Sequence, residues 1–232
     1  MCGQRPIGHS PRRGERPNVP GMQSVPELVD TTVAQAALRL SRSTESPAVF
    51  NHSVRSYLFG ELLAAHDGMR HGVDYDSQTL FLGCVLHDLG AGSAAPGKAR
   101  FEVEGADLAA ALLGEHGCDN EVVDTVWEAI ALHTCFGIAE RRGPICYLVH
   151  AGVGMDFGRN AEFVDDRTAA LIHDQYPRLS MATTLVDAIT THAQRSPEAA
   201  PPYTVPGGLL LERRTNGITA LEQLESLGRW GE

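Results

Sequence analysis

Apolar residues recur along this chain at the three- and four-residue spacing of amphipathic helices, and no two segments alternate as paired strands would. The clearest run starts at Ser46-Pro47 and continues through Val49, Val54, Leu58 and Leu62. The same spacing predicts helices over residues 24–40, 46–63, 77–87, 102–115, 120–133, 144–156, 166–175, 181–194 and 219–230. The pattern therefore predicts an all-α fold, a bundle in which functional sites form between facing helices.

Local signals place the ends of these helices and the loops between them. Ser24 and Glu27 have the spacing of a capping box, which predicts the start of the first helix. The polar stretch 91–100 is expected to be an exposed loop, and the Pro- and Gly-rich stretch 196–208 a loop or linker. The short run 209–211 stays ambiguous between helix and strand.

The first 22 residues differ in composition from the rest of the chain. They are rich in Pro, Gly and Arg and lack an apolar stretch, which predicts a disordered tail rather than a secretory signal. Translation from Met22 instead of Met1 stays open. The remainder, residues 23–232, has the length of a single domain.

Composition narrows the classes of partner. The formal net charge is −10 and no basic stripe stands out, which argues against a nucleic-acid ligand and favours a small molecule. No apolar run approaches the ~20 residues that cross a bilayer. An odd number of cysteines without a CxxC pair indicates free thiols in a reducing cytoplasm. Assembly into a homo-oligomer stays open.

Candidate chemistry begins at His87-Asp88, where an apolar helix ends and Gly90 follows. Imidazole nitrogen and carboxylate oxygen are both good ligands for divalent metals, although such a pair can also be a surface or capping feature. His52 lies among apolar neighbours, which alone would suggest a buried structural histidine. Asp156 ends another apolar helix and could simply cap it.

Taken together, five sequence blocks resemble the HD superfamily of metal-dependent hydrolases, and within it the cyanamide hydratase-like branch. The blocks cover 51–57 (NHSVRSY), 86–90 (LHDLG), 101–106 (FEVEGA), 131–134 (ALHT) and 151–156 (AGVGMD). They span about residues 49–157, and their order is more specific than the His-Asp pair alone. The resemblance implies an HD-type helical domain.

The resemblance also implies four metal ligands, namely His52, His87, Asp88 and Asp156. Two nitrogens and two oxygens suit one divalent ion, with zinc expected and iron or manganese also compatible. Where two-metal members carry a further histidine, this chain has Glu102, which favours a single metal. A two-metal site with Glu102 and His133 as extra ligands is the alternative.

Three further residues are expected to take part in catalysis. Glu102 is expected either to carry protons or to orient the metal ligands from behind, and His133 is expected to carry protons, although His133 alone would also fit a half-buried core histidine. Arg55 follows His52 by three residues and therefore shares its helix face. It could hold Asp88 or Glu102 in place, or it could bind an anionic substrate. Lys98 and Arg100 could also bind an anionic substrate. His150 is close enough to Asp156 in sequence to line the same cavity.

The reaction implied by the closer resemblance is hydration or hydrolysis of a nitrile-like compound such as cyanamide, in which a metal-activated water attacks a small electrophile. The wider superfamily leaves a phosphohydrolase acting on a nucleotide or other small phosphate ester as the alternative. A non-catalytic helical protein with a structural metal is the third possibility.

Overall fold

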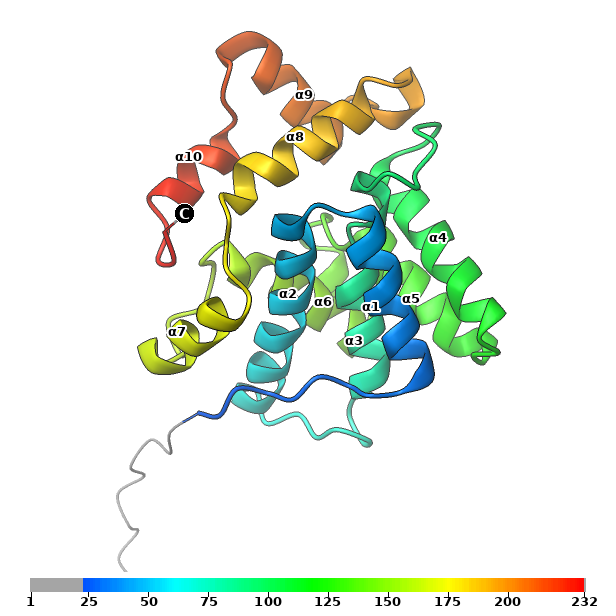
Figure 1. Ribbon diagram of the computed structural model, residues 1–232, viewed down its shortest axis with the longest axis vertical. Helices are drawn as coiled ribbons and strands as arrows, with labels where there is room; N and C mark the ends of the chain where they lie inside the picture. Colours follow the sequence, from blue (N-terminus) through cyan, green and yellow to red (C-terminus); the bar gives the residue numbers. More distant parts are fainter. Residues whose placement is uncertain (1–22, 232) are drawn as a thin grey trace, which may run out of the picture.

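A computed structural model describes residues 23–231, within which the secondary structure is helical and no strand is present (Figure 1). The helices are α1 (Thr32–Thr44), α2 (Pro47–His66), α3 (Ser77–Leu86), α4 (Phe101–Glu115), α5 (Asn120–Leu132), α6 (Pro144–Asp156), α7 (Asp166–Gln175), α8 (Met181–Ala193), α9 (Val205–Asn216) and α10 (Ala220–Ser226). Three short 3-10 turns join them: η1 (Leu89–Ala91), η2 (Ala139–Arg141) and η3 (Pro197–Ala199). The all-α prediction is confirmed, whereas the predicted tail and the choice of start residue lie outside the described part.

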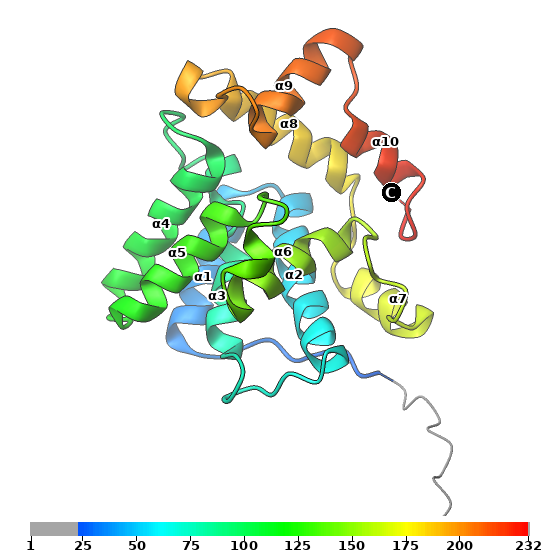
Figure 2. The same cartoon turned by 180° about the vertical axis from the view of Figure 1, so that it is seen from behind.

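Helix α2 is the centre of the bundle. Ser46 caps it through a hydrogen bond from the backbone N–H of Val49, and Pro47 occupies the first turn, as the sequence predicts. Its side chains are buried on nearly all sides, because α3, α6, α7 and α8 all contact it (Figures 1 and 2). The central position of α2 explains why it is buried all round rather than on one stripe, and why its polar residues such as His52 and Arg55 are buried too.

Helices α2 and α6 approach closely at glycine. A Cβ added to Gly152 on α6 would clash with the carbonyl oxygen of Ser56 and lie 3.1 Å from the backbone nitrogen of Gly60, both on α2. The missing side chain lets the two backbones come together. Because His52 lies on α2 and Asp156 on α6, this approach also sets the spacing of the site.

The last three helices form a separate layer across one end of the bundle (Figures 1 and 2). Helix α8 packs on α2 and η1, while α9 and α10 pack on α8. A second apolar cluster lies under this layer and includes Val49, Phe101, Leu185 and Leu209. The layer therefore covers the end of α2 from which His52 comes.

Two sequence-based predictions of helix position are wrong. Helix α1 starts at Thr32, capped by Thr31, and Ser24 does not begin a helix. The backbone oxygen of Gln23 accepts a hydrogen bond from Thr168 and its side chain bonds the loop before α7, so this segment is held by tertiary contacts instead.

The predicted loop 196–208 contains η3 and the start of α9. Thr204 caps α9 and Pro206 lies in its first turn, so the Pro- and Gly-rich composition marked a helix start as well as a loop. The ambiguous run 209–211 is therefore helical. The stretch 91–100 is also less exposed than predicted, because Glu104 accepts hydrogen bonds from the backbone N–H groups of Gly97, Lys98 and Ala99.

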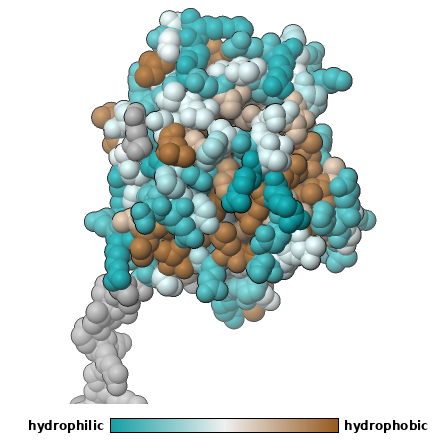
Figure 3. Space-filling view, in the orientation of Figure 1, coloured by the Kyte–Doolittle hydropathy of each residue, from teal (hydrophilic) through white to brown (hydrophobic). Residues whose placement is uncertain are grey.

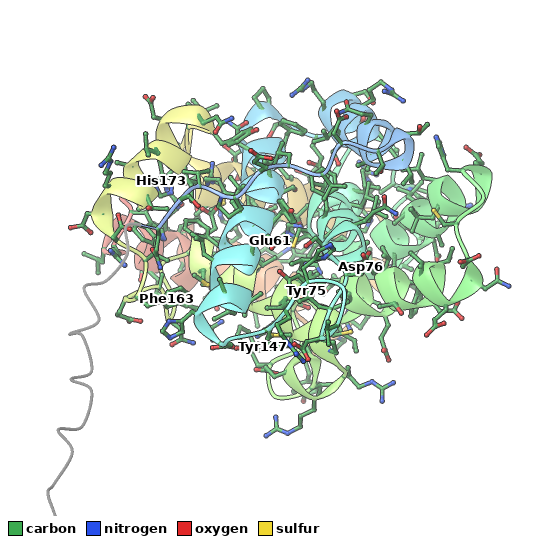
Figure 4. The ribbon with its side chains drawn as sticks, turned by 90° about the horizontal axis from the view of Figure 1, so that it is seen from below. Glu61, Tyr75, Asp76, Tyr147, Phe163 and His173 are labelled. Carbon is green, nitrogen blue, oxygen red and sulfur yellow. The ribbon has the colours of Figure 1, made fainter. Side chains whose placement is uncertain are left out.

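The opposite end of the bundle and the surface carry ordinary contacts. The Tyr75 hydroxyl donates a 2.7 Å hydrogen bond to Glu61 of α2, and Figure 4 labels both residues. Hydrophobic side chains on the face in Figure 3 lie in patches between hydrophilic ones.

No helix of the described part is both long and apolar enough to cross a membrane. The four cysteines in that part are free thiols, as predicted.

Replacing Gly152 by Ala is expected to destabilise the fold by about 1–3 kcal/mol, because the added Cβ has no room against α2. Gly114→Ala on α4 is the matched control, since a Cβ there meets nothing within 4 Å. That change is expected to stabilise the helix by up to about 1 kcal/mol. Urea unfolding measures both, and equal effects would contradict the close α2–α6 approach.

Candidate metal centre

Three side chains from two parts of the chain converge at one point. His52 comes from the second turn of α2, and His87 and Asp88 come from the turn that joins α3 to η1. Gly90 allows this turn to lie directly against the start of α4, because a Cβ there would clash with the carbonyl oxygen of Phe101. The glycine that follows the His-Asp pair thus fixes where both side chains point.

The geometry of the three side chains is that of a metal site. One ligand atom from each lies within 4.8 Å of the others. His87 Nε2 is 3.1 Å from Asp88 Oδ2, and His52 Nε2 is 3.8 Å from the same oxygen. All three atoms are buried, and within residues 23–231 none has a hydrogen-bond partner. A buried polar atom without a partner is costly, so three together form a group that could hold a cation.

Hydrogen bonds at the Nδ1 atoms fix the orientation of the His52 and His87 rings. His87 Nδ1 lies 2.7 Å from the Cys84 carbonyl oxygen, which can only accept, so Nδ1 carries the hydrogen. His52 Nδ1 likewise lies 2.7 Å from a carboxylate oxygen of Asp156. In the neutral rings both Nε2 atoms therefore carry lone pairs that point toward Asp88. Two imidazole nitrogens and one carboxylate suit zinc, iron or manganese.

The electrostatics keep the site negative and ready for a cation. Burial alone would raise the pKa of Asp88, but the neighbouring His87 and His52 lower it well below its usual range. Burial lowers the pKa of His52. Burial also opposes charge on His87, yet the adjacent Asp88 outweighs it and raises the pKa of His87.

Asp156 lies elsewhere than the sequence predicts. Its carboxylate is on the Nδ1 side of the His52 ring, away from Nε2, and it is outside the three-residue group. Arg55 donates two 2.7 Å hydrogen bonds to it, and Arg178 donates a third at 3.2 Å. Both carboxylate oxygens are thus engaged, and Asp156 orients His52 in the manner of a carboxylate behind a metal-binding histidine.

Arg55 has a different contact from those expected. It bonds neither Asp88 nor Glu102, and its remaining donors go to the carbonyl oxygens of Tyr176 and Pro177. The side chain is fully buried. Arg55 therefore holds Asp156 in place and is not available to an anionic substrate.

A pocket of about 300 Å³ opens above the three-residue group, and His133 and His150 line it. The His133 ring lies 4.9 Å from that of His87, and its Nδ1 is 2.6 Å from the Ile130 carbonyl oxygen. Burial lowers the pKa of His133 to about 4, so at neutral pH its Nε2 carries a lone pair. His150 helps to hold the His133 backbone in place, because the Nδ1 atom of His150 lies 2.6 Å from the His133 carbonyl oxygen.

Glu102 is buried beside the pocket rather than in its lining. Its carboxylate accepts hydrogen bonds from Arg100 at 2.6 Å and from the Thr134 hydroxyl at 2.7 Å. Thr134 does line the pocket, so Glu102 reaches it through that residue. Neither Arg100 nor the exposed Lys98 lines the pocket. Among the described residues that line the pocket, Arg159 is the one lysine or arginine, and it packs over the Phe136 ring.

Comparison with known proteins agrees with this geometry. No curated protein matches the chain. A family model described as the HD domain matches residues 49–168, just over half of the chain. The match contains His52, the His87-Asp88 pair and Asp156. The chain therefore belongs to the HD domain family of metal-dependent hydrolases.

Proposed function

We propose that this protein is a metal-dependent hydratase that adds water across the carbon–nitrogen triple bond of a nitrile-like compound, of which cyanamide is the simplest. The oxygen of water bonds to the carbon, both hydrogens end on the nitrogen, and no group leaves. The product is an amide, or urea from cyanamide. One observation carries the proposal: three unpartnered ligand atoms lie at the floor of a pocket with little positive charge.

His52, His87 and Asp88 would hold one divalent ion, with zinc proposed and iron or manganese compatible with the same donors. When bound, such an ion supplies Lewis-acid activation of water and substrate. Asp156 keeps the His52 ring turned so that Nε2 lies on the side of Asp88, and Arg55 keeps Asp156 in place.

His133 is placed to move the proton. Its Nδ1–H is used by the Ile130 carbonyl, so Nε2 is free to accept a proton from water and return it to the substrate nitrogen. Glu102 acts one step further away, because its carboxylate fixes the Thr134 hydroxyl and Arg100. We propose it as a positioning residue rather than the proton carrier.

The charges around the pocket argue against the phosphohydrolase alternative. Phosphoryl transfer needs positive charge around the phosphoryl oxygens. Arg55 is committed to Asp156 and Arg100 to Glu102. In the lining, the single arginine, Arg159, packs over Phe136 and Glu212 adds a carboxylate. A purely structural metal is disfavoured as well, since closed structural sites use four protein ligands and here three converge beside a pocket.

A panel of substrates tests the reaction itself. Zinc-loaded protein is expected to release urea from cyanamide and amides from simple nitriles, and to lose this activity after chelation and regain it on metal return. Phosphate release from nucleotides and from p-nitrophenyl phosphate is the parallel assay. Phosphate release without amide formation would replace the hydratase proposal by the phosphohydrolase alternative.

Replacing Asp88 by Ala is expected to lower bound metal from near one ion per chain to near none, because it removes the carboxylate of the group. Elemental analysis measures the metal, and circular dichroism is expected to show an unchanged helical spectrum. Asp74→Ala is the control, since Asp74 is exposed and bonds only Arg70. Full metal content in the Asp88 variant would remove this residue from the site.

His133→Ala is expected to keep the metal and to lower kcat by roughly 100- to 10,000-fold, the usual contribution of a general acid–base group. His116→Ala is the matched control, because His116 also bonds a backbone carbonyl but lies exposed at the end of α4. Glu102→Gln is expected to keep the metal and to lose less activity than His133→Ala. Loss of a second ion in the His133 variant would instead favour the two-metal alternative.

A further inference from the structure

The walls of the pocket are apolar, in contrast to its floor. Six aliphatic side chains from the C-terminal layer line it: Leu185, Ile189, Val205, Leu209, Leu221 and Leu224. Phe101, Phe136, Val153 and Phe157 add apolar surface from the bundle. A water-filled space with such walls is unfavourable, and apolar groups that enter it gain the free energy of leaving water.

These six residues all lie beyond residue 168, where the HD family match ends. The metal group comes from the matched region, whereas the wall opposite it comes from α8, α9 and the start of α10. The aliphatic part of the wall contributed by α8, α9 and α10 therefore does not follow from the family match.

The size of the pocket also exceeds what the simplest substrate needs. About 300 Å³ is at the lower end of the range of roughly 300–1,000 Å³ found for pockets that hold drug-sized ligands. Cyanamide, a cyano group joined to an amino group, would occupy only the floor beside the metal group. The remaining space faces aliphatic side chains and would hold water without partners.

Charged groups of the pocket are few. Arg159 is exposed and packs over Phe136, and Glu212 accepts a hydrogen bond from the backbone N–H of Ala220. Apart from Asp88 in the metal group, the lining thus holds one cation and one carboxylate, so the part away from that group has little net charge. A neutral body suits it better than an anionic or cationic one.

The apolar wall is anchored to the metal group by buried charges. Arg178 donates to the backbone and side chain of Asp156 and also to Glu225 on α10, whose other oxygen accepts from the Ala182 N–H. Arg178 and Glu225 are both buried. Helix α10, which carries Leu221 and Leu224, is thus fixed relative to Asp156 and His52, so the pocket is formed before a ligand enters.

We propose that the substrate carries a neutral aliphatic or aromatic body of several carbon atoms, which packs against the side chains of α8, α9 and α10 while its reactive group lies at the metal group. This inference rests on the proposed metal centre and names the substrate class of the same site. A nitrile or related compound with an apolar substituent is the preferred substrate over cyanamide.

Straight-chain hydroxamic acids, from acetohydroxamic to octanohydroxamic acid, test the wall through binding alone. The hydroxamate head chelates the metal in every member, so only the length of the tail changes. In the zinc-loaded protein, titration calorimetry is expected to show about three- to four-fold tighter binding per added CH₂ until the pocket is filled. Affinity that does not depend on tail length, or no binding by any member, overturns the proposal.

Matched variants show whether the gain comes from this wall. Leu209→Ser and Leu221→Ser are expected to reduce the gain per CH₂, while Leu211→Ser and Leu227→Ser, at 66% and 85% exposed and outside the lining, are expected to keep it. Leu221 is only partly buried, so its variant keeps the test valid if the Leu209 variant unfolds. An unchanged gain in the Leu221 variant overturns the proposal.

Turnover separates this inference from the proposed reaction. Hexanenitrile is expected to have a higher kcat/KM than cyanamide. A tail-length gain in hydroxamate binding without turnover of any nitrile defeats the hydratase proposal and leaves the apolar ligand class standing. Turnover of cyanamide without any tail-length gain supports the reaction and overturns the apolar substrate class.

Discussion

The site depends on one buried carboxylate, that of Asp156. Burial would raise its pKa, but Arg55, His173 and His52 hold that pKa well below the usual range. A buried charge is tolerated only when it is paired and hydrogen-bonded. Here two arginines and an imidazole satisfy both oxygens, and they come from α2 and from the segment before α8. The carboxylate therefore joins α2, α6 and that segment at one fixed point.

The orientation of the metal group follows from this point. Because Asp156 accepts a hydrogen bond from Nδ1–H of His52, the lone pair on Nε2 of that ring faces Asp88. The Cys84 carbonyl accepts from Nδ1–H of His87 and orients the His87 ring in the same way. These contacts orient the three ligand atoms toward one another, and none of the three has a hydrogen-bond partner within the described residues. A divalent ion is expected to bind strongly here, because it would satisfy all three ligand atoms.

The sequence predicted the local features of this arrangement better than the long-range ones. Ser46-Pro47, the His87-Asp88 pair and Pro144 are signals that depend on a few neighbouring residues, and the structure agrees with each. The roles of Asp156 and Arg55 depend on which side of an imidazole a carboxylate lies, and spacing along the chain does not contain that information. Helix α9 was missed because Pro206 and its glycines look like a loop until Thr204 is seen to cap them.

The metal group and most of the aliphatic pocket wall come from different parts of the chain. The matched HD region supplies the histidines and Asp88, where distances must be kept within the reach of one ion. Helices α8 to α10 supply apolar walls, where side chains of different size can be exchanged at modest cost to the fold. The link through Arg178 and Glu225 joins the two parts rigidly. Changes confined to the wall side chains are therefore expected to alter the pocket while leaving this link to Asp156 intact.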